Sequence, residues 1–116
     1  VCKLDSGGNL IWRFQGHSAG ILDISPDLAG NIYVTGYDSL VTCVDTSGSL
    51  IWDYVTSSVG HSVSATIDGS VYVGQQDGNI LKLDAAGSLV WTRGVGSERI
   101  ASVISSPAVG AFVSFW

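Results

Sequence analysis

One eight-residue segment recurs three times along the chain at a nearly constant spacing. Its copies are Asp5-Ser-Gly-Gly-Asn-Leu-Ile-Trp12, Asp45-Thr-Ser-Gly-Ser-Leu-Ile-Trp52 and Asp84-Ala-Ala-Gly-Ser-Leu-Val-Trp91. Successive tryptophans stand 40 and then 39 residues apart. Upstream, Asn31-Ile-Tyr-Val34 matches Ser70-Val-Tyr-Val73 in the same register. A fixed period of this length indicates a chain built from copies of one supersecondary unit.

Each unit has the residue pattern of short antiparallel strands. Runs rich in Val, Ile, Leu, Tyr and Trp, which favour strands, alternate with Asp-Gly, Ser-Gly and Gly-Asn pairs, which favour hairpin turns. The predicted strands inside the repeats are residues 31–35, 40–44, 50–55, 70–73 and 80–83. No segment keeps an apolar period of 3.6 residues over the length of a helix. Four strands in about 40 residues match a β-propeller blade, so we predict an all-β chain of propeller blades.

The repeat register divides the chain, which we expect to be a single β-propeller segment over residues 1–116, into four parts. These are a half blade 1–14, a blade 15–55, a blade 56–93 and a half blade 94–116. The last part is predicted to hold an inner strand over residues 101–109 and a second strand over residues 112–116. The twelve predicted strands amount to roughly three blade equivalents.

Three blade equivalents are too few for a closed propeller, which has four to eight blades. We therefore expect the ring to be completed in one of two ways. Two copies of the chain form a homodimer with twofold symmetry and a six-bladed ring, or the remaining blades belong to a longer chain. The sequence contains no methionine, and we expect a chain that was processed or excised from a longer one.

The repeated tryptophans have a predicted structural role. A blade exposes an apolar face that only a neighbouring blade can bury, and a large ring on the outermost strand fills the gap between the two. Burial of such a ring removes about 150–250 Å² from water. We therefore assign Trp12, Trp52 and Trp91 to the contacts between blades. Trp52, between two complete blades, is expected to be among the most buried side chains.

The composition excludes some classes of partner. The formal net charge is −5, which disfavours binding to nucleic acid or to anionic lipid. No apolar run approaches the roughly 18 residues of a membrane span. The acids do not form a run in the sequence, and Asp5, Asp45 and Asp84 occupy equivalent turn positions of the repeat. Turn chemistry therefore explains much of the acidity.

The two cysteines, Cys2 and Cys43, lack the spacing of a zinc site. In the repeat register Cys2 aligns with Thr42, one residue before Cys43. The two thiols then lie on equivalent strands of adjacent blades but point to opposite faces. A disulfide needs facing Cβ atoms and Cα atoms within about 7 Å, so we predict that the two cysteines do not pair with each other.

Residues 71–91, Val71-Tyr-Val-Gly-Gln-Gln-Asp-Gly-Asn-Ile-Leu-Lys-Leu-Asp-Ala-Ala-Gly-Ser-Leu-Val-Trp91, resemble the pyrroloquinoline-quinone-like (PQQ-like) repeat family of β-propellers. Ser105-Ser-Pro-Ala-Val-Gly110 resembles the motif that opens the inner strand of that family's blades. The resemblance ends at Ala111-Phe-Val-Ser-Phe-Trp116, where the family continues with an Asp-Gly turn and a Tyr-Val strand. The resemblance implies a propeller fold and favours a periplasmic or extracellular location.

The Trp-Asp repeat family, also of propellers, is the alternative. Gly16-His17, Ile24-Ser-Pro-Asp27 and Trp52-Asp53 are similar to its landmarks. However, the positions that should carry its Trp-Asp pair hold Val44-Asp45 and Leu83-Asp84, and the tryptophan falls one strand later. That placement is similar to the PQQ-like repeat, which we therefore favour.

The sequence predicts no catalytic, cofactor-binding or metal-binding residue. The resemblance extends to the quinoprotein dehydrogenases that share this fold. It implies that such an enzyme would have a central calcium site and, in many members, a pair of adjacent cysteines. Neither feature has a counterpart in this sequence, since Cys2 and Cys43 are not adjacent and Glu98 is the only glutamate. His17 and His61 lack a third metal ligand. We predict that the chain is not an enzyme. The alternative is that it is a fragment of a PQQ-dependent dehydrogenase or of a sugar-handling propeller enzyme, with the active site outside this chain.

The loops that differ most between repeats are residues 14–20, 53–60 and 92–100. Variable loops on a rigid frame are the usual location of a binding surface. The candidate residues for contacts with a partner, in or directly beside these loops, are His17, His61, Arg93, Glu98 and Arg99. We therefore predict a non-catalytic scaffold that binds a protein or ligand through its loops. The sequence does not identify that partner.

Overall fold

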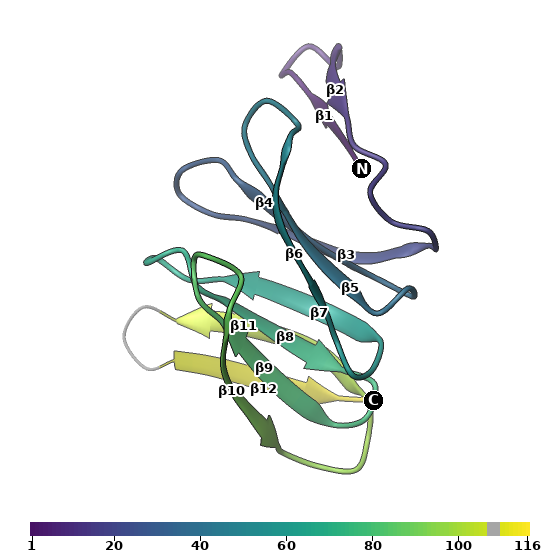
Figure 1. Ribbon diagram of the computed structural model, residues 1–116, viewed down its shortest axis with the longest axis vertical. Helices are drawn as coiled ribbons and strands as arrows, with labels where there is room; N and C mark the ends of the chain where they lie inside the picture. The colour runs from purple at the N-terminus through teal and green to yellow at the C-terminus, as the bar shows by residue number, and fades with distance from the viewer. Residues whose placement is uncertain (107–109) are drawn as a thin grey trace.

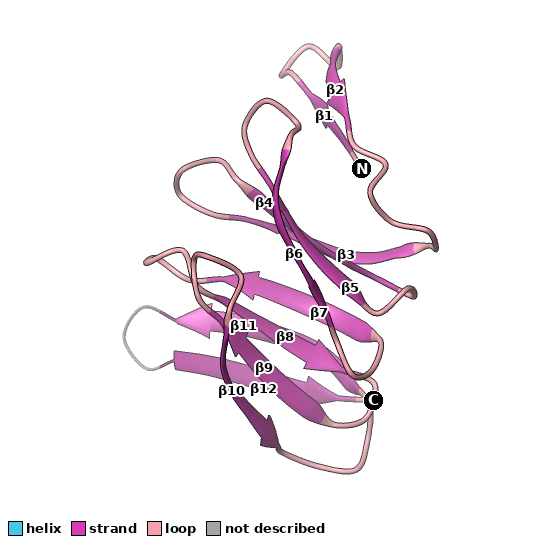
Figure 2. Cartoon of the chain, in the orientation of Figure 1, coloured by secondary structure: helices cyan, strands magenta, loops and turns pink. Residues whose placement is uncertain are grey.

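The computed structural model describes residues 1–106 and 110–116, and this part of the chain is all-β (Figures 1 and 2). Twelve strands form four antiparallel sheets, which confirms the predicted fold class and strand number. The strands are β1 (Cys2–Leu4), β2 (Leu10–Arg13), β3 (Ile21–Pro26), β4 (Ile32–Gly36), β5 (Leu40–Val44), β6 (Leu50–Val55), β7 (Gly60–Ala65), β8 (Val71–Gln75), β9 (Asn79–Leu83), β10 (Leu89–Gly94), β11 (Ile100–Ser106) and β12 (Gly110–Phe115).

The sheets follow one another along the chain. The first blade is β3-β4-β5-β6 and the second blade is β7-β8-β9-β10, each a four-stranded sheet of sequential neighbours. A two-stranded sheet precedes them, the N-terminal pair β1–β2, and another follows, the C-terminal pair β11–β12. The predicted inner strand over residues 101–109 corresponds to β11, although residues 107–109 of that prediction lie outside the described residues. The predicted strand over residues 112–116 corresponds to β12.

Tight turns join the first strand to the second and the third to the fourth, and they gather along one side of the molecule, here called the turn rim (Figure 1). Its described turns are residues 5–9, 27–31, 45–49, 66–70 and 84–88. In the turn after Asp45, the carboxylate accepts the N–H groups of Ser47 at 2.9 Å and Ser49 at 3.0 Å. Gly48 in the same turn has a φ of +88°, which favours glycine. The repeated Asp and Gly therefore specify these turns locally.

The opposite side, here called the connector rim, carries the links between blades and the short turns between the second and third strands of each blade (Figure 1). Its described segments are residues 14–20, 37–39, 56–59, 76–78 and 95–99. All three candidate loops predicted from the sequence therefore extend along this rim.

The inner strands β3, β7 and β11 pack side by side and are joined by side chains. Asp23 Oδ2 of β3 accepts the N–H of Val63 of β7 at 2.9 Å. Ser62 of β7, at the position equivalent to Asp23, accepts the N–H of Val103 of β11 at 3.1 Å. Two residues further along the strands, Ser25 Oγ accepts the N–H of Ala65 at 3.1 Å, and Ser64 Oγ accepts the N–H of Ser105 at 2.8 Å. We call these repeated hydrogen bonds the inner ladder.

Apolar side chains fill the space between neighbouring sheets. The cluster between the two blades consists of Tyr33, Val41, Cys43, Val63, Val71, Val73, Leu81 and Leu83. The cluster between the second blade and the C-terminal pair consists of Tyr72, Ile80, Ile100 and Val103. The core of the molecule therefore lies between sheets, as expected for blades that cannot bury their faces alone.

The three repeated tryptophans, Trp12, Trp52 and Trp91, lie on the outermost strands and are half-buried. The expectation that Trp52 is among the most buried side chains is wrong, because an outermost strand has no neighbour on its outer side and leaves one edge of the ring accessible. The inner part of the Trp52 ring packs against Tyr33, with ring centroids 5.9 Å apart. Its Nε1 donates to the carbonyl oxygen of Ala85 in the second blade at 3.0 Å. Trp52 thus joins the two blades without being enclosed by them.

Both cysteines are free: Cys2 on β1 is exposed and Cys43 on β5 is buried. Cys43 belongs to the cluster between the two blades. Burial, above all, raises the pKa of the Cys43 thiol to about 11, and the reactive thiolate is correspondingly scarce near neutral pH.

We predict that Trp52→Ala lowers the free energy of unfolding by about 3 kcal/mol, the lower end of the range for a core aromatic side chain. The substitution removes the contact with Tyr33 and the hydrogen bond to Ala85. Trp116→Ala is the control, since this ring is 73% exposed and its loss should cost less than about 1 kcal/mol. Urea unfolding of both variants measures the difference, and equal losses would contradict the role of Trp52 between blades.

Candidate functional site

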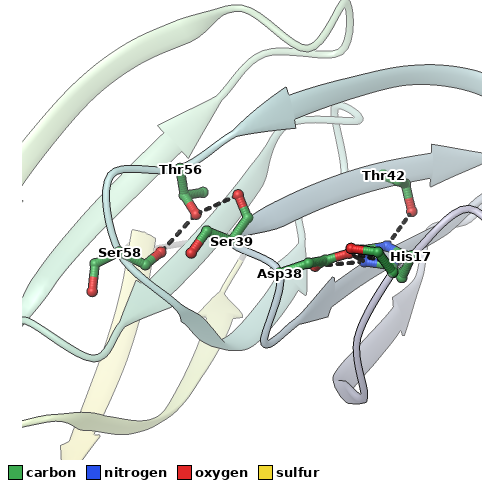
Figure 3. A network of polar contacts seen from close by, with 7 residues as sticks. His17, Asp38, Ser39, Thr42, Thr56 and Ser58 are labelled. Atoms are coloured by element: carbon green, nitrogen blue, oxygen red, sulfur yellow. Dashed lines mark hydrogen bonds and ion pairs between the residues drawn. The ribbon is translucent and has the colours of Figure 1, made fainter.

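His17 is held inside the connector rim by two side chains of the first blade (Figure 3). Its Nδ1 lies 3.0 Å from Asp38 Oδ1, and its Nε2 lies 3.0 Å from Thr42 Oγ1. The ring is only 3% exposed. These contacts fit a proton on Nδ1 that is donated to the carboxylate, with Nε2 accepting from the hydroxyl. His17 therefore fixes its loop on the blade and does not offer its ring to a partner at the surface.

Asp38 is the charged member of this network. Burial on its own would raise the pKa of Asp38, but hydrogen bonds from the His17 side chain and the Ser18 N–H hold the pKa below its usual value of 3.8. The Ser18 N–H lies 2.9 Å from Asp38 Oδ2. The carboxylate therefore remains ionised at neutral pH and orders residues 17 and 18.

A Thr–His–Asp sequence of hydrogen bonds has the connectivity of a nucleophilic triad. However, Thr42 is buried, with a residue exposure of 1%, and its hydroxyl faces His17. No substrate carbonyl can approach Oγ1 in this arrangement. Among the described residues no group of three or more His, Cys, Asp or Glu side chains is arranged to hold a metal ion. The network is therefore part of the frame of the blade.

The next connector loop is held in a similar way (Figure 3). The hydroxyl of Thr56 lies 2.9 Å from the carbonyl oxygen of Ser39 and 2.6 Å from that of Ser58. The buried Gln75 side chain donates from Nε2 to the carbonyl of Ser58 at 3.1 Å. These contacts fix residues 56–58 against the turn between β4 and β5 and against the end of β8.

His61, in contrast, lies at the surface where the two blades meet. Its ring makes an edge-to-face contact with Tyr37, with centroids 6.3 Å apart at 82°. Its Nε2 is 3.4 Å from Gln76 Oε1, at the long end of hydrogen-bond distances. Tyr37 is exposed. Tyr37 was not among the candidates predicted from the sequence. It lies beside His61 because the two blades stack against each other.

The remaining candidate residues lie in the last segment of the connector rim, residues 95–99, and on the adjoining end of β10. Arg93 and Glu98 are exposed, and Arg99 is half-buried. The Arg99 guanidinium lies 4.3 Å from the centre of the Trp116 ring, and that of Arg93 lies 5.9 Å from the Trp91 ring. The structure thus leaves Arg93 and Glu98 exposed and Arg99 half-buried, in contrast to the enclosed ring of His17.

A hollow of about 330 Å³ opens between the two blades on the turn rim. Leu28 and Ile67, at equivalent positions of successive turns, stand beside it and are 83% and 65% exposed. Tyr33 and Cys43 line it, and the Tyr33 hydroxyl lies 3.0 Å from Asp27 Oδ2. The sequence analysis did not predict this hollow. The signal in the sequence was an exposed apolar residue at the second position of two equivalent turns, Leu28 in turn 27–31 and Ile67 in turn 66–70.

The turn rim also carries the net charge of the protein. Its five described turns contain five of the ten acidic residues and none of the lysines, arginines or histidines. Their formal charge of −5 equals that of the whole chain, and the other acids and bases balance. Hydrogen bonds within the turns hold the pKa values of Asp5, Asp45 and Asp68 below their usual range. The acids that are dispersed in the sequence are thus gathered on one rim by the fold.

Within the described residues, no helix is both long and apolar enough to pass through a membrane.

The family model described as outer membrane protein assembly factor BamB matches residues 1–114, nearly the whole chain. No curated protein matches the chain significantly.

We predict that His17→Ala destabilises the protein by about 1–3 kcal/mol, because it leaves the buried Asp38 and Thr42 without their partner. His61→Ala is the matched control, since its ring lies at the surface and its loss should change stability by no more than about 0.5 kcal/mol. Thermal and urea unfolding compare the two variants. A larger loss for His61→Ala would contradict the assignment of His17 to the frame.

We also predict that Asp38 contributes to acid sensitivity. Because its pKa is lowered in the folded protein, its stabilisation is fully present above the unfolded value of 3.8 and is lost as the pH falls through the lower folded value. Urea unfolding should be followed between about pH 7 and pH 2. Below about pH 4 the wild type should lose more stability than Asp38→Asn, and parallel pH profiles would contradict this.

Proposed function

Since the chain belongs to the family of PQQ-like repeat β-propellers described as outer membrane protein assembly factor BamB, we propose that it is a non-catalytic scaffold that binds a partner through its loops. The description of the family names an assembly factor, which favours an interaction role over catalysis. The proposed partner is a protein or ligand that contacts the connector rim.

One observation supports this role above the others: the polar side chains inside the blades form the frame. His17 and Asp38 hold a loop, and Asp23 joins neighbouring inner strands. Side chains engaged in this way are positioned for rigidity and not for binding a substrate. Rigid frames that present exposed side chains at their loops are suited to recognition.

The proposed contact surface consists of exposed and half-buried side chains on the connector rim and on the adjoining ends of β7 and β10. Its members are Tyr37, His61, Arg93, Glu98 and Arg99. The surface combines aromatic rings with charges of both signs. Aromatic and arginine side chains are the residues most often responsible for binding energy at protein interfaces, which favours a protein partner.

The proposed ring requires more blades than the three equivalents in this chain, since closed propellers have at least four. A second copy of the chain, or further blades of a longer chain, would complete it. Either arrangement leaves the connector rim accessible, because blades join through their faces and inner strands.

We predict that the protein does not take up pyrroloquinoline quinone in the presence of calcium. The protein should be mixed with both, separated from free cofactor by gel filtration, and examined for bound-cofactor absorbance and for dye reduction with alcohols and sugars. A PQQ-dependent dehydrogenase serves as positive control. Stoichiometric uptake with substrate-dependent dye reduction would contradict the non-catalytic role and favour the enzymatic alternative.

The loop surface is tested by comparing two sets of substitutions on the immobilised protein. The first combines Tyr37→Ala, His61→Ala and Arg99→Ala on the connector rim, and the second combines Leu28→Ser and Ile67→Ser on the turn rim. Proteins retained from a cell extract by the wild type and the second variant, but lost with the first, would support the connector rim. Loss only with the turn-rim variant would contradict it.

A further inference from the structure

The turn rim carries a groove at the junction between the first and the second blade. Its outer part is the hollow of about 330 Å³ described above. Its inner part, of about 410 Å³, lies against the inner strands β3, β7 and β11, each of which contributes one lining residue. The two parts share Asp27, Leu28 and Ile67. They therefore form one continuous site, here called the interblade groove.

Two apolar side chains stand at the edges of this groove, one from each blade. Leu28 is the second residue of the turn that joins β3 to β4, and Ile67 is the second residue of the turn that joins β7 to β8. The two side chains are 83% and 65% exposed. The equivalent positions of the other described turns hold Ser6, Thr46 and Ala85. Turn geometry therefore does not require the two apolar residues.

Ile67 remains exposed although its blade has a sheet on each side. Strand β7 packs against β3 of the first blade and against β11 of the C-terminal pair. Stacking of sheets buries the faces of strands, whereas Ile67 stands on a turn at the rim. A molecule that approaches the turn rim would remove Ile67 and Leu28 from water, which is favourable in proportion to the apolar area covered.

The floor of the groove holds its two walls together. The Tyr33 hydroxyl lies 3.0 Å from Asp27 Oδ2 in the turn of the first blade and 3.1 Å from the carbonyl oxygen of Gly69 in the turn of the second. Ile51 of β6 is 51% exposed and continues the apolar lining at the outer end. A groove whose walls are fixed before binding costs a ligand less ordering than one that must form.

Two carboxylates border the apolar surface. Asp27 Oδ1 accepts the N–H groups of Ala29 and Asn31, both at 2.9 Å. Asp68 accepts the hydroxyl of Ser70 at 2.6 Å. Hydrogen bonds from Ser70 and then Thr66 hold the pKa of Asp68 below its usual value, so this carboxylate is ionised at neutral pH.

No cation of the described chain neutralises these two carboxylates. The ion pair found among the described residues joins His17 to Asp38, outside the groove. Lys82 is the weakest of the influences that lower the pKa of Asp68, and it forms no ion pair with it. The donors to Asp27 and Asp68 are all uncharged, so both negative charges remain available to a ligand.

Charge and apolar surface together define the ligand chemistry. An apolar groove bordered by carboxylates complements a segment whose apolar side chains are flanked by lysine or arginine. The formal charge of −5 on the turn rim disfavours anionic lipid and nucleic acid. The two volumes lie within the range of about 300–1,000 Å³ in which binding sites enclose ligand groups.

We propose that the interblade groove binds a segment of a partner protein in which apolar side chains alternate with lysine or arginine. The apolar side chains contact Leu28 and Ile67, and the cationic groups lie beside Asp27 and Asp68. This surface is on the opposite side of the blades from the connector rim. It does not depend on the partner proposed there.

A defined peptide tests the ligand chemistry. The probe is a fluorescent peptide of about ten residues in which leucine and lysine alternate, so that an extended chain places all leucines on one face. We expect the full chain to bind it with a Kd of about 100 µM or lower, measured by fluorescence anisotropy. Two control peptides, one with glutamate for lysine and one with serine for leucine, should bind at least about tenfold more weakly.

The location is tested with substitutions of the two apolar edges. Leu28→Ser combined with Ile67→Ser should weaken binding of the leucine–lysine peptide at least about tenfold. Val55→Ser combined with Val95→Ser is the matched control. These residues are 73% and 46% exposed and lie outside the groove. The control should change the Kd less than about twofold.

The charges are tested with a second matched pair of variants. Asp27→Asn combined with Asp68→Asn keeps a side-chain acceptor in each turn and should weaken binding about threefold or more at low salt. Asp5→Asn combined with Asp77→Asn changes the net charge equally at exposed positions outside the groove, and it should have a smaller effect. Circular dichroism confirms that each variant keeps its sheets.

Each comparison can overturn the inference. A Kd above about 1 mM for the leucine–lysine peptide or equal binding of the control peptides would refute the ligand chemistry. Equal effects of the groove variants and their matched controls would refute the location. The combined Tyr37→Ala, His61→Ala and Arg99→Ala variant should bind the peptide as the wild type does. Loss of a partner at the connector rim is therefore distinguishable from loss of binding at the groove.

Discussion

Burial between sheets is the interaction on which the rest of this structure depends. Each blade is a single layer of strands, and its apolar residues become a core only when the next sheet covers them. Val41 and Cys43 of the first blade meet Leu81 and Leu83 of the second in one cluster. The same requirement explains the inner ladder on the innermost strand of each blade and the tryptophan contacts on the outermost strand. Both hold the sheets at the separation at which apolar side chains touch.

The polar side chains follow from this arrangement. A buried polar group costs free energy unless it is hydrogen-bonded, and Asp23, His17 and Thr42 each have a partner from another element. Their role is to connect strands and loops that the apolar contacts bring together. The side chains of Tyr37, which is exposed, and of His61, which is half-buried beside it, make no such buried hydrogen bond. The separation between frame and exposed rim underlies the proposed scaffold role.

The fold also separates charge. Turn aspartates are selected locally because each carboxylate accepts N–H groups of its own turn. Alternate turns of antiparallel strands lie at the same end of a sheet, so these acids gather on the turn rim, while the acids and bases in the rest of the chain balance each other. An acidic rim attracts cations and repels anionic partners over about one Debye length. The connector-rim segments hold Asp38, Asp77 and Glu98 against Arg99, so a partner there meets a weaker negative field.

The sequence by itself determined the repeat, through matches 40 and 39 residues apart. It also determined the strands and turns, because these depend on residues within a few positions of each other. The strands β5 and β6 have the predicted bounds, and the Asp45 turn closes through its own N–H groups. Only the tertiary structure decided which distant residues meet. His17 and Asp38 are 21 residues apart, and Tyr37 reaches His61 only where blades stack. Trp52 is half-buried because an outermost strand has a neighbour on one side only, a fact of sheet order that no residue pattern specifies.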